Sequence, residues 1–293
     1  MSAADFPRYV EFQTTSRCNA RCTVCPMHWT ADALPQGRMT DELLDRLLGE
    51  LAEHADELLS VEPYLNNEPF MDRRFLDVLR RIRAFTNTSV EVSTNATLLR
   101  PEVADAVLEE GLINDFRMSV FGADRETYES VMKLDWDRMT RNITHYARRW
   151  VELGRPNRSR VVYVHNPRLQ RPDEFERLRA RWEPLGLGFI NWAQLDRVGN
   201  VPFRQRDPMR VPGRVTNCKM GYMRDRVAIS YDGSVFLCCQ DWSRVERIGS
   251  VCEGGIAGVW NGPARARHHR WIYGEDLAPP DHLCRNCELA TIG

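Results

Sequence analysis

Cysteine side chains offer the clearest chemistry in this 293-residue sequence. Of its nine cysteines, three lie close together near the start of the chain, at Cys18, Cys22 and Cys25. Thiolates at this spacing bind a metal ion or an iron–sulfur cluster, and either kind of site usually takes four ligands. With three thiolates, one position stays open to a small molecule, or a distant side chain such as His28 completes a zinc site.

A second set of cysteines occupies the last third of the chain. Its members are Cys218, Cys238, Cys284 and Cys287. The first two flank Gly233 in a C-x14-G-x4-C pattern, and the last two form a CxxC pair. Four such thiolates suit a zinc ribbon or a cluster bound entirely by protein, and the spacing alone does not distinguish these sites. Cys239 and Cys252 belong to neither set.

The bulk composition excludes several classes of function. The 40 Lys and Arg residues balance 41 Asp and Glu residues, so no basic field predicts nucleic-acid binding. No apolar run approaches the ~20 residues that a membrane span needs, and the N-terminus lacks the pattern of a secretory signal. We expect a cytoplasmic protein with reduced thiols, in which the cysteines serve metal binding or catalysis.

Apolar stretches alternate with amphipathic ones up to about residue 200, which is typical of a parallel α/β sheet. Strands are predicted at residues 8–15, 58–65, 89–95, 114–120, 160–166 and 188–195. Helices are predicted between them, at residues 40–55, 72–85, 101–111, 136–154 and 172–186. In such sheets the chemistry lies at the carboxyl ends of the strands. The first cysteine group, Glu68, Asn95 and Arg197 all follow predicted strands at that edge.

The character of the sequence changes after residue 200. Residues 199–217 are rich in Pro, Gly and Arg, which indicates a linker. Two short strands around Asp232-Gly233 predict a β-hairpin, and a short helix is expected near residues 256–260. We interpret residues 266–271 (ARHHRW) as a solvated helix face and not as a metal site. The predicted domains are residues 1–205 and 206–293.

The predicted sheet and the first cysteine group together resemble the radical SAM superfamily. The resemblance rests on a three-cysteine loop that follows the first strand of a six-strand α/β barrel. It implies a partial (β/α)6 TIM-like barrel and a [4Fe–4S] cluster bound by Cys18, Cys22 and Cys25. In that family the open iron is chelated by S-adenosylmethionine (SAM), whose cleavage gives a 5′-deoxyadenosyl radical. The family also implies an electron donor such as flavodoxin or ferredoxin.

Other positions are similar to the same family. Glu68, in the sequence NNEP (66–69), matches a residue that holds the methionine amino group, which suits an ammonium. Asn66 and Asn67 replace the usual two glycines, and Asn67 is expected to offer an amide contact to SAM or substrate. Val24 stands where the family has an aromatic residue against adenine, so that contact is smaller or supplied elsewhere. Further contacts to SAM are implied at Ser93, Asn95 and Ser119.

The C-terminal cysteines resemble the SPASM domain, the auxiliary-cluster module of many radical SAM enzymes. Because few residues follow Cys287, we expect the shortened "twitch" form of this domain. It implies one auxiliary [4Fe–4S] cluster, ligated by Cys218, Cys238, Cys284 and Cys287. A cluster saturated by protein cannot also bind SAM, so it would exchange an electron with a substrate radical or support the structure. The domain would also close the barrel against water.

Within this subfamily the chain resembles two types of enzyme. One type epimerises an aminoglycoside carbon, and the other oxidises a ring alcohol of 2-deoxy-scyllo-inosamine. Both abstract a hydrogen atom from carbon, but an epimerase then needs a donor on the opposite face of the ring, and a thiol is suitable because S–H is weaker than C–H. We expect Cys239 to be this donor, because neighbours on an extended strand point to opposite sides. The alternatives are a buried apolar side chain or another cluster ligand, and Cys252 is expected to have no catalytic role.

Three polar residues complete the expected substrate site. Arg197 is expected to orient a substrate hydroxyl, because a guanidinium stays protonated. Asp241 and Asp196 would accept a proton or bind substrate amines. The leading hypothesis is epimerisation at a carbinol carbon of an aminoglycoside or related sugar, and the alternative is oxidation of that alcohol to a ketone. A non-catalytic zinc-binding protein and an enzyme acting on peptides are further alternatives.

Overall fold

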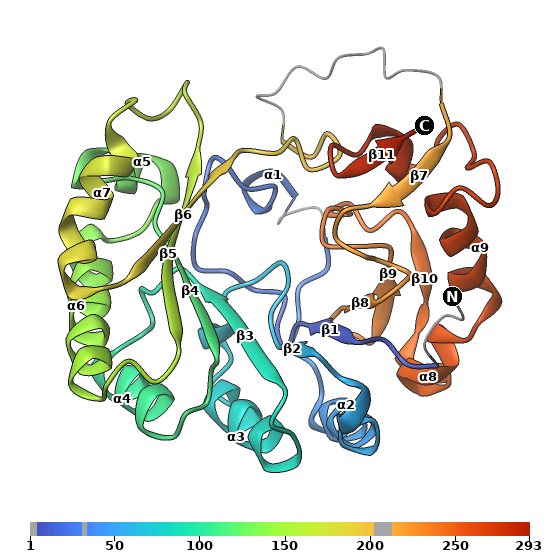
Figure 1. The fold of residues 1–293 in the computed structure, drawn as a ribbon, viewed down its shortest axis with the longest axis horizontal. Helices are drawn as coiled ribbons and strands as arrows, with labels where there is room; N and C mark the ends of the chain where they lie inside the picture. Colours follow the sequence, from blue (N-terminus) through green and yellow to red (C-terminus); the bar gives the residue numbers. More distant parts are fainter. Residues whose placement is uncertain (1–4, 31–33, 202–212) are drawn as a thin grey trace.

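A curved parallel sheet forms the centre of the fold (Figure 1). The computed structural model describes residues 5–30, 34–201 and 213–293. The strands of the barrel are β1 (Tyr9–Phe12), β2 (Ser60–Glu62), β3 (Ser89–Thr94), β4 (Asp115–Ser119), β5 (Arg158–His165) and β6 (Gly188–Ala193). Each pairs in parallel with the next, so their carboxyl ends share one edge. The predicted α/β class, the partial barrel and its six strands are confirmed.

Helices cover the outer face of this sheet (Figure 1). They are α2 (Asp41–Glu53), α3 (Phe75–Phe85), α4 (Pro101–Glu109), α5 (Arg125–Met132), α6 (Trp136–Glu152) and α7 (Glu174–Trp182). In α2, Thr40 caps the first turn by accepting a hydrogen bond from the Leu43 N–H, and five leucines at helical spacing are buried. Burial stabilises each such leucine by about 1.5–3 kcal/mol. No helix in the described part of the chain is both long and apolar enough to cross a membrane.

Helix α5 adds to the predicted helices. Asp124 caps it by accepting a hydrogen bond from the Thr127 N–H. Lys133 then ends it in the left-handed conformation, at φ 59°, shortly before Trp136 begins α6. The helix predicted from Trp136 onward is therefore preceded by a separate short helix, α5. Helix α5 lies against the loop that carries the first cysteines. A further short helix, α1 (Met27–Thr30), belongs to that loop.

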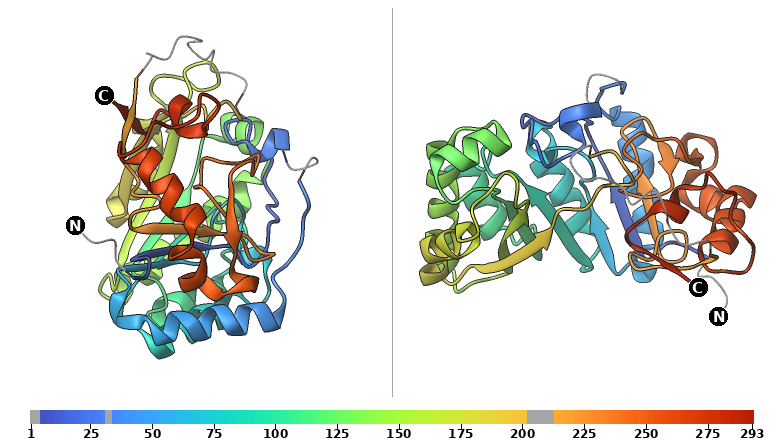
Figure 2. Two further views of the ribbon diagram at one scale, coloured as in Figure 1. Left: turned by 90° about the vertical axis from the view of Figure 1, so that its right-hand side faces the viewer. Right: turned by 90° about the horizontal axis from the view of Figure 1, so that it is seen from above.

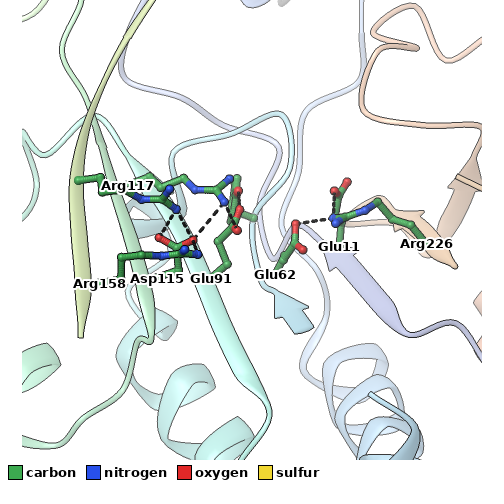
Figure 3. A network of polar contacts seen from close by, with 9 residues as sticks. Glu11, Glu62, Glu91, Asp115, Arg117, Arg158 and Arg226 are labelled. Carbon is green, nitrogen blue, oxygen red and sulfur yellow. Dashed lines mark hydrogen bonds and ion pairs between the residues drawn. The ribbon is translucent and has the colours of Figure 1, made fainter. Parts of the chain in front are cut away.

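The barrel strands are apolar on one face and charged on the other. Val10 and Phe12 of β1 are buried in the apolar core, and Glu11 between them points to the inner face of the barrel (Figure 3). Parallel pairing aligns Glu11 with Glu62 and Glu91 with Asp115, so these carboxylates share that face. Arg117 and Arg158 lie beside them (Figure 3). The barrel interior is thus a polar surface below the carboxyl edge.

The C-terminal part extends the barrel sheet at its β1 edge. Strand β8 (Arg226–Ile229) pairs in parallel with β1, and the antiparallel strands β9 (Ser234–Phe236) and β10 (Arg247–Ser250) follow it. The described residues thus form one nine-stranded sheet. The remaining elements are the paired strands β7 (Val215–Cys218) and β11 (Ala290–Ile292) and the helices α8 (Gly255–Trp260) and α9 (Pro263–Ile272).

The right-hand view of Figure 2 places this C-terminal part, in orange and red, at the opposite end of the molecule from α6 and α7, in green and yellow. The predicted hairpin around Asp232-Gly233 is confirmed, and Gly233 supplies the positive φ of 81° that its turn requires. The predicted boundary between residues 205 and 206, in the middle of the expected linker, lies outside the described residues.

Arg226 joins the C-terminal part to the inner face of the barrel. Its Nη1 lies 2.6 Å from a carboxylate oxygen of Glu11 and 2.7 Å from one of Glu62 (Figure 3). All three side chains are almost fully buried. Burial raises the pKa of both carboxyls, to about 7 for Glu62, and the guanidinium opposes the rise. Buried charges are tolerated only when paired, so this contact depends on both parts of the chain being in place.

Helix α9 confirms the solvated face predicted for residues 266–271 only in part, because Arg267 and Arg270 are exposed whereas His268 is buried. Arg265 and His268 are buried, and the guanidinium of Arg265 lies 4.1 Å from the centre of the Trp260 ring. His268 Nδ1 lies 3.1 Å from His282 Nε2. Burial lowers the pKa of both imidazoles to about 4, so this pair is neutral near pH 7. The contact between His268 and His282 joins the helix to the segment that leads to the CxxC pair.

Candidate functional site

The first cysteine group lies in the loop that leaves β1 along the carboxyl edge of the sheet. The Thr23 N–H donates to the Val131 carbonyl of α5 at 2.8 Å, which holds the middle of the loop. The Asn95 side chain, predicted to contact SAM, donates to Asn19 Oδ1 at 2.8 Å and accepts from the Thr97 hydroxyl at 2.6 Å. These contacts give Asn95 a part in shaping the loop, and its contact with SAM stays a prediction.

The three sulfurs of this loop lie in one electrostatic neighbourhood. Burial raises the pKa of Cys18 to about 12, and the charges of Glu68 and Cys25 add to the rise. The pKa of Cys22 is raised by burial first and then by the charges of Cys25 and Cys18. Thiols in such surroundings are neutral until a metal replaces the proton. The loop therefore brings three sulfurs within electrostatic influence of one another or of Glu68.

A single metal ion has no ready-made site in the described part of the chain. No three His, Cys, Asp or Glu side chains there converge closely enough to bind one ion. Sulfurs that ligate a four-iron cluster stand farther apart, because each binds a different iron. The side chain of His28, the alternative zinc ligand, lies outside what the structure describes. The arrangement of thiols fits a cluster better than a zinc ion.

Glu68 follows β2, and neighbouring groups hold its carboxylate in place. Oε1 accepts hydrogen bonds from the Thr94 hydroxyl at 2.8 Å and the Phe70 N–H at 3.2 Å, and Oε2 accepts from the Asn95 N–H at 2.7 Å. The residue is 1% exposed, and burial raises its pKa to about 7 against the effect of these bonds. A buried carboxylate beside Cys18 fits an ammonium group, whose charge would favour the ionised form.

Asn67, Ser93 and Ser119 lie where the sequence places candidate SAM contacts. Asn67 Oδ1 accepts a hydrogen bond from the Leu65 N–H at 2.9 Å, while its Nδ2 is buried without a partner among the described residues. Ser93 and Ser119 are half-buried near the carboxyl ends of β3 and β4, on the same face as Glu91 and the other inner charges. A buried amide donor without a partner is expensive, so the Asn67 amide fits a ligand that accepts a hydrogen bond, such as a carboxylate.

The second cysteine group surrounds one pocket. Its lining includes Cys218, Cys238, Cys284, Cys287, Tyr222, Leu237, Ile272 and Leu289. The four thiols come from β7, the turn after β9 and the 3-10 helix η5 (Leu283–Asn286) with the residue after it. The pairing of β7 with β11 brings the first and last of these segments together. Four thiols around a mainly apolar pocket fit a cluster that is ligated entirely by protein.

Cys239 faces a different part of the molecule from Cys238. Strand β9 ends at Phe236, so both cysteines lie beyond it and the predicted alternation along an extended strand does not apply. Cys238 lines the four-cysteine pocket. Burial and the Glu11 carboxylate raise the pKa of Cys239 to about 11, against a hydrogen bond with the Tyr222 side chain. The hydrogen bond with Tyr222, which also donates to Glu11, places the half-buried Cys239 thiol near the inner face of the barrel.

Arg197, which follows β6, lies near sulfurs of both regions. Burial raises the pKa of Cys25 and of Cys239, and the Arg197 guanidinium opposes the rise at both sulfurs. Its backbone is unusual, because Arg197, Val198 and Gly199 have φ values of 52°, 57° and 78°. The left-handed conformation costs roughly 1–2 kcal/mol for a residue with a side chain. Such strain is concentrated at functional sites, where the surrounding contacts maintain it.

Contacts of the two predicted acidic residues favour structural roles. Asp241 is 1% exposed, and its two carboxylate oxygens accept hydrogen bonds from the Val245 and Glu246 N–H groups, each at 3.0 Å. Asp196 Oδ1 accepts from the Val198 N–H at 2.9 Å. Asp241 therefore stabilises the turn after the second cysteine group, and the catalytic role predicted for it stays a prediction. Asp196 supports the strained segment that carries Arg197.

Cys252 lies apart from both sites. Its sulfur contacts the Asp232 carbonyl at 3.7 Å near the hairpin turn, and it lines a surface hollow with Leu43 and Glu50 of α2. The absence of a catalytic role for Cys252 stays a prediction.

Two residues that the sequence does not single out join the site. Gln194 Nε2 donates to the Val24 carbonyl of the cluster loop at 3.2 Å. The buried hydroxyl of Tyr222 donates to Glu11 and contacts Cys239. The role of Gln194 could have been suspected from the sequence, because it is a polar residue at the carboxyl end of a predicted strand. Tyr222 had none, because its role depends on the pairing of β8 with β1.

The fold and the two cysteine sites define an iron–sulfur protein built on a partial α/β barrel. The chain belongs to the radical SAM superfamily, whose family profile matches residues 12–178. The profile of an iron–sulfur cluster-binding domain, SPASM, matches residues 218–288. The protein is thus a radical SAM enzyme with a SPASM domain. Its predicted cofactors, SAM with a [4Fe–4S] cluster and an auxiliary iron–sulfur cluster, are confirmed.

Comparison with individual proteins supports the fold. The chain is 32% identical over 106 residues to the tungsten-containing aldehyde ferredoxin oxidoreductase cofactor-modifying protein of Pyrococcus furiosus, a match that covers 36% of this chain and 28% of that protein. The matched stretch is therefore less than a third of the relative's length.

Solved structures resemble almost the whole chain. Streptococcus suis SuiB, bound to its precursor peptide SuiA, is 13% identical, with a TM-score of 0.71 over 98% of this chain and 71% of SuiB. BtrN, in complex with AdoMet and 2-DOIA, is 14% identical, with a TM-score of 0.58 over 97% of this chain and 92% of BtrN. At these identities the similarity establishes the fold alone.

Proposed function

We propose that this enzyme removes a hydrogen atom from a carbinol carbon of an aminoglycoside or aminocyclitol and returns one to the opposite face, which epimerises that carbon. The observation that carries the proposal is the position of Cys239. Its thiol lies near Glu11 on the inner face of the barrel. The Arg197 guanidinium lies near this thiol and also near Cys25 of the cluster loop. A thiol in that position can give a hydrogen atom to a substrate radical.

We assign the cofactor ligands from the contacts described above. The SAM-binding cluster takes Cys18, Cys22 and Cys25, and the auxiliary cluster, a second [4Fe–4S] centre, takes Cys218, Cys238, Cys284 and Cys287. Glu68 binds the amino group of SAM, and the unpaired Nδ2 of Asn67 binds the carboxylate of SAM. Ser93 and Ser119 are further contacts. When bound, SAM and its cluster supply the primary-carbon radical that abstracts the substrate hydrogen.

The chain's own residues then complete the inversion. Cys239 transfers the hydrogen atom of its S–H bond to the substrate radical, so a C–H bond forms on the face opposite the bond that was broken. The sulfur is left as a thiyl radical, and one electron and one proton return it to the thiol. A one-electron reductant supplies the electron, and the adjacent Cys238 offers a short path from the auxiliary site. Tyr222, which donates to Glu11, can deliver the proton.

A small polyamine substrate suits the inner face of the barrel. Glu11 and Glu62 pair with Arg226 there, and Glu91 pairs with Arg117, so the inner face is a charged surface that suits a polar substrate. Arg197 would orient a substrate hydroxyl, because its guanidinium remains protonated. BtrN, which resembles this chain over 97% of its length, binds 2-DOIA, a small molecule. SuiB binds a peptide, so a peptide substrate is an outcome that the test must be able to detect.

The test is a reaction of anaerobically reconstituted protein with SAM, a reductant and a panel of aminoglycosides and peptides in D2O. The proposal predicts 5′-deoxyadenosine and an isomeric product with one deuterium at the inverted carbon, because thiol hydrogens exchange with solvent. Cys239→Ala should still form 5′-deoxyadenosine but lose the inversion. Cys252→Ala is the matched control and should behave as the wild type does.

Different outcomes separate the alternatives. An oxidised product from the unaltered enzyme would establish the dehydrogenase reaction in place of epimerisation. Normal inversion by Cys239→Ala would remove Cys239 from the mechanism. Tyr222→Phe should complete a first inversion with the thiol already present and then fall about tenfold or more in multiple turnovers, because the proton is delivered more slowly.

A further inference from the structure

Three exposed arginines surround a hollow beside the first cysteine group. The hollow is lined by Thr15, Arg17, Arg38, Met71, Asp72 and Arg73. It lies on the chain segments that flank the cluster loop and follow Glu68, and the three guanidinium groups stand at its surface. We call these six residues the arginine hollow.

The arginines of this hollow differ from their neighbour Arg74. Within the described residues, Arg17, Arg38 and Arg73 form no ion pair. Arg74, in contrast, binds Asp72 at 2.8 Å and also pairs with Asp41. Asp72, the only carboxylate among the described residues that line the hollow, is therefore already neutralised by Arg74. Three unpaired cations remain, and they favour an anionic partner.

The position of the hollow connects it to the SAM-binding cluster. Arg17 directly precedes Cys18, and its carbonyl accepts a hydrogen bond from the Glu68 N–H at 3.0 Å. The buried Thr15 hydroxyl donates to the Gly37 carbonyl at 3.1 Å, which fixes the segment that carries Arg38. A partner seated here would lie against Arg17, the residue that directly precedes Cys18.

Met71 gives the hollow an apolar centre. Its side chain is 36% exposed, and the three charges surround it. A charged rim around a small apolar contact is suited to brief encounters between proteins, because complementary charges raise the association rate more than the affinity. Electron-transfer complexes are of this kind and bury less than about 1,200 Å².

We propose that the arginine hollow is the docking surface for an acidic protein that carries a one-electron centre and reduces the SAM-binding cluster. Each cleavage of SAM consumes one electron, so the reaction requires such a donor. The inference rests on the cluster and its family, and it holds whether the product is an epimer or a ketone. The partner is defined by its negative charge and by its one-electron redox centre.

The experiment compares two ways of delivering electrons. The triple variant Arg17→Gln, Arg38→Gln, Arg73→Gln is mixed with reduced flavodoxin of strongly negative charge, and loss of visible cluster absorbance is followed in a stopped-flow instrument. Formation of 5′-deoxyadenosine without substrate is measured in parallel. We expect the second-order rate with flavodoxin to fall at least about tenfold at low ionic strength. The difference should shrink at about 0.5 M salt, and the rate with dithionite should not change.

A matched control separates docking from general charge. Arg138, Arg141 and Arg148 are exposed on α6 and form no ion pair among the described residues. Replacing these three with Gln changes the net charge equally and should leave the flavodoxin rate within about twofold of the wild type, because none of the three lines the arginine hollow.

Three outcomes would overturn the proposal. The first is a hollow variant that flavodoxin reduces at the wild-type rate at low salt. The second is an equal loss with dithionite, which would mean that the arginines support the cluster site itself. The third is a wild-type dimer that the substitutions dissociate, since the hollow would then bind a second copy of the chain. An enzyme that proves not to be an epimerase would leave all of these measurements valid.

Discussion

The two cysteine groups reach similar chemistry by opposite routes. The first lies on one loop after β1, and contacts with α5 and with Asn95 after β3 hold that loop. The second is assembled from β7, the turn after β9 and the η5 segment, which are far apart in the sequence. A contiguous group keeps its ligands together through the local chain, whereas a dispersed group exists only when its domain is folded.

Their surroundings differ as much as their assembly. The first group lies beside Glu68 and Arg197, charged groups that suit a charged small molecule. The second lines a pocket with Leu237, Ile272 and Leu289, so its immediate surroundings are mainly apolar. A cluster in a polar site with an open position can react with a ligand, and a saturated cluster in an apolar site is restricted to electron transfer or structural support. The predictions below test this contrast.

The largest effect is expected in the first group. Cys22→Ser should abolish SAM cleavage, because the loop then keeps too few thiolates to hold its cluster. Iron content should fall from about eight to about four per chain, while the thermal unfolding midpoint changes little. Cys252→Ser serves as the control and should retain full iron and full cleavage. Wild-type cleavage of SAM by Cys22→Ser would refute the assignment of the first site.

The second group should respond differently to the same change. Cys284→Ser should also lose about four irons per chain, yet it should still cleave SAM to 5′-deoxyadenosine, because the first site is intact. Product formation should be lost, and the unfolding midpoint should drop, since the cluster joins three segments of one domain. Iron analysis, product assay and thermal unfolding measure the three effects. Complete loss of SAM cleavage would mean that the two sites do not work independently.

This contrast also explains what the sequence could predict. Cys18, Cys22 and Cys25 could be identified from their spacing because the chemistry needs them on one loop. Glu68 could be placed because parallel strands bring their carboxyl ends to one edge. The role of Asn95 as a brace for Asn19, and of Asp241 as a turn residue, depends on hydrogen-bond partners that no periodicity reveals.

The contacts that join the two regions were also beyond prediction. Arg226 and Tyr222 reach Glu11 only because β8 adds to the β1 edge, a pairing between strands more than two hundred residues apart. The burial of His268 was missed because the ARHHRW segment is polar in composition, although its imidazole finds His282 inside the domain. Long-range pairing decides these positions, and the local sequence carries no signal for it.

The junction between the regions should contribute strongly to stability. Arg226→Met leaves Glu11 and Glu62 buried without their cation, which should cost about 3–5 kcal/mol in the free energy of unfolding. Chemical denaturation measures this loss. Arg81→Met is the control, because it removes an exposed pair with Asp45 and should change stability far less. Equal losses in the two variants would mean that Arg226 does not join barrel and C-terminal part as described.

The smallest expected effect is a pH dependence confined to the barrel interior. Glu91 pairs with Arg117 and accepts a hydrogen bond from Tyr64, but burial, followed by the charge of Glu62, raises its pKa from 4.5 to about 7. A raised pKa in the folded state means that this carboxyl contributes stability below pH 4.5, and the contribution is lost as pH rises through about 7. The change should amount to about 1–3 kcal/mol.

Glu91→Gln should therefore flatten the decline in stability between pH 5 and 7, as measured by urea denaturation across that range. Glu110 on the surface is a suitable comparison, because its hydrogen bonds with Arg80 lower its pKa, and Glu110→Gln should leave that interval unchanged. The His268–His282 pair acts with the opposite sign, since its lowered pKa removes stability as pH falls below about 6.5. If stability changed with pH at the same slope in wild type and Glu91→Gln, Glu91 would not titrate in this range. The polar character of the first region would then be confined to its carboxyl edge.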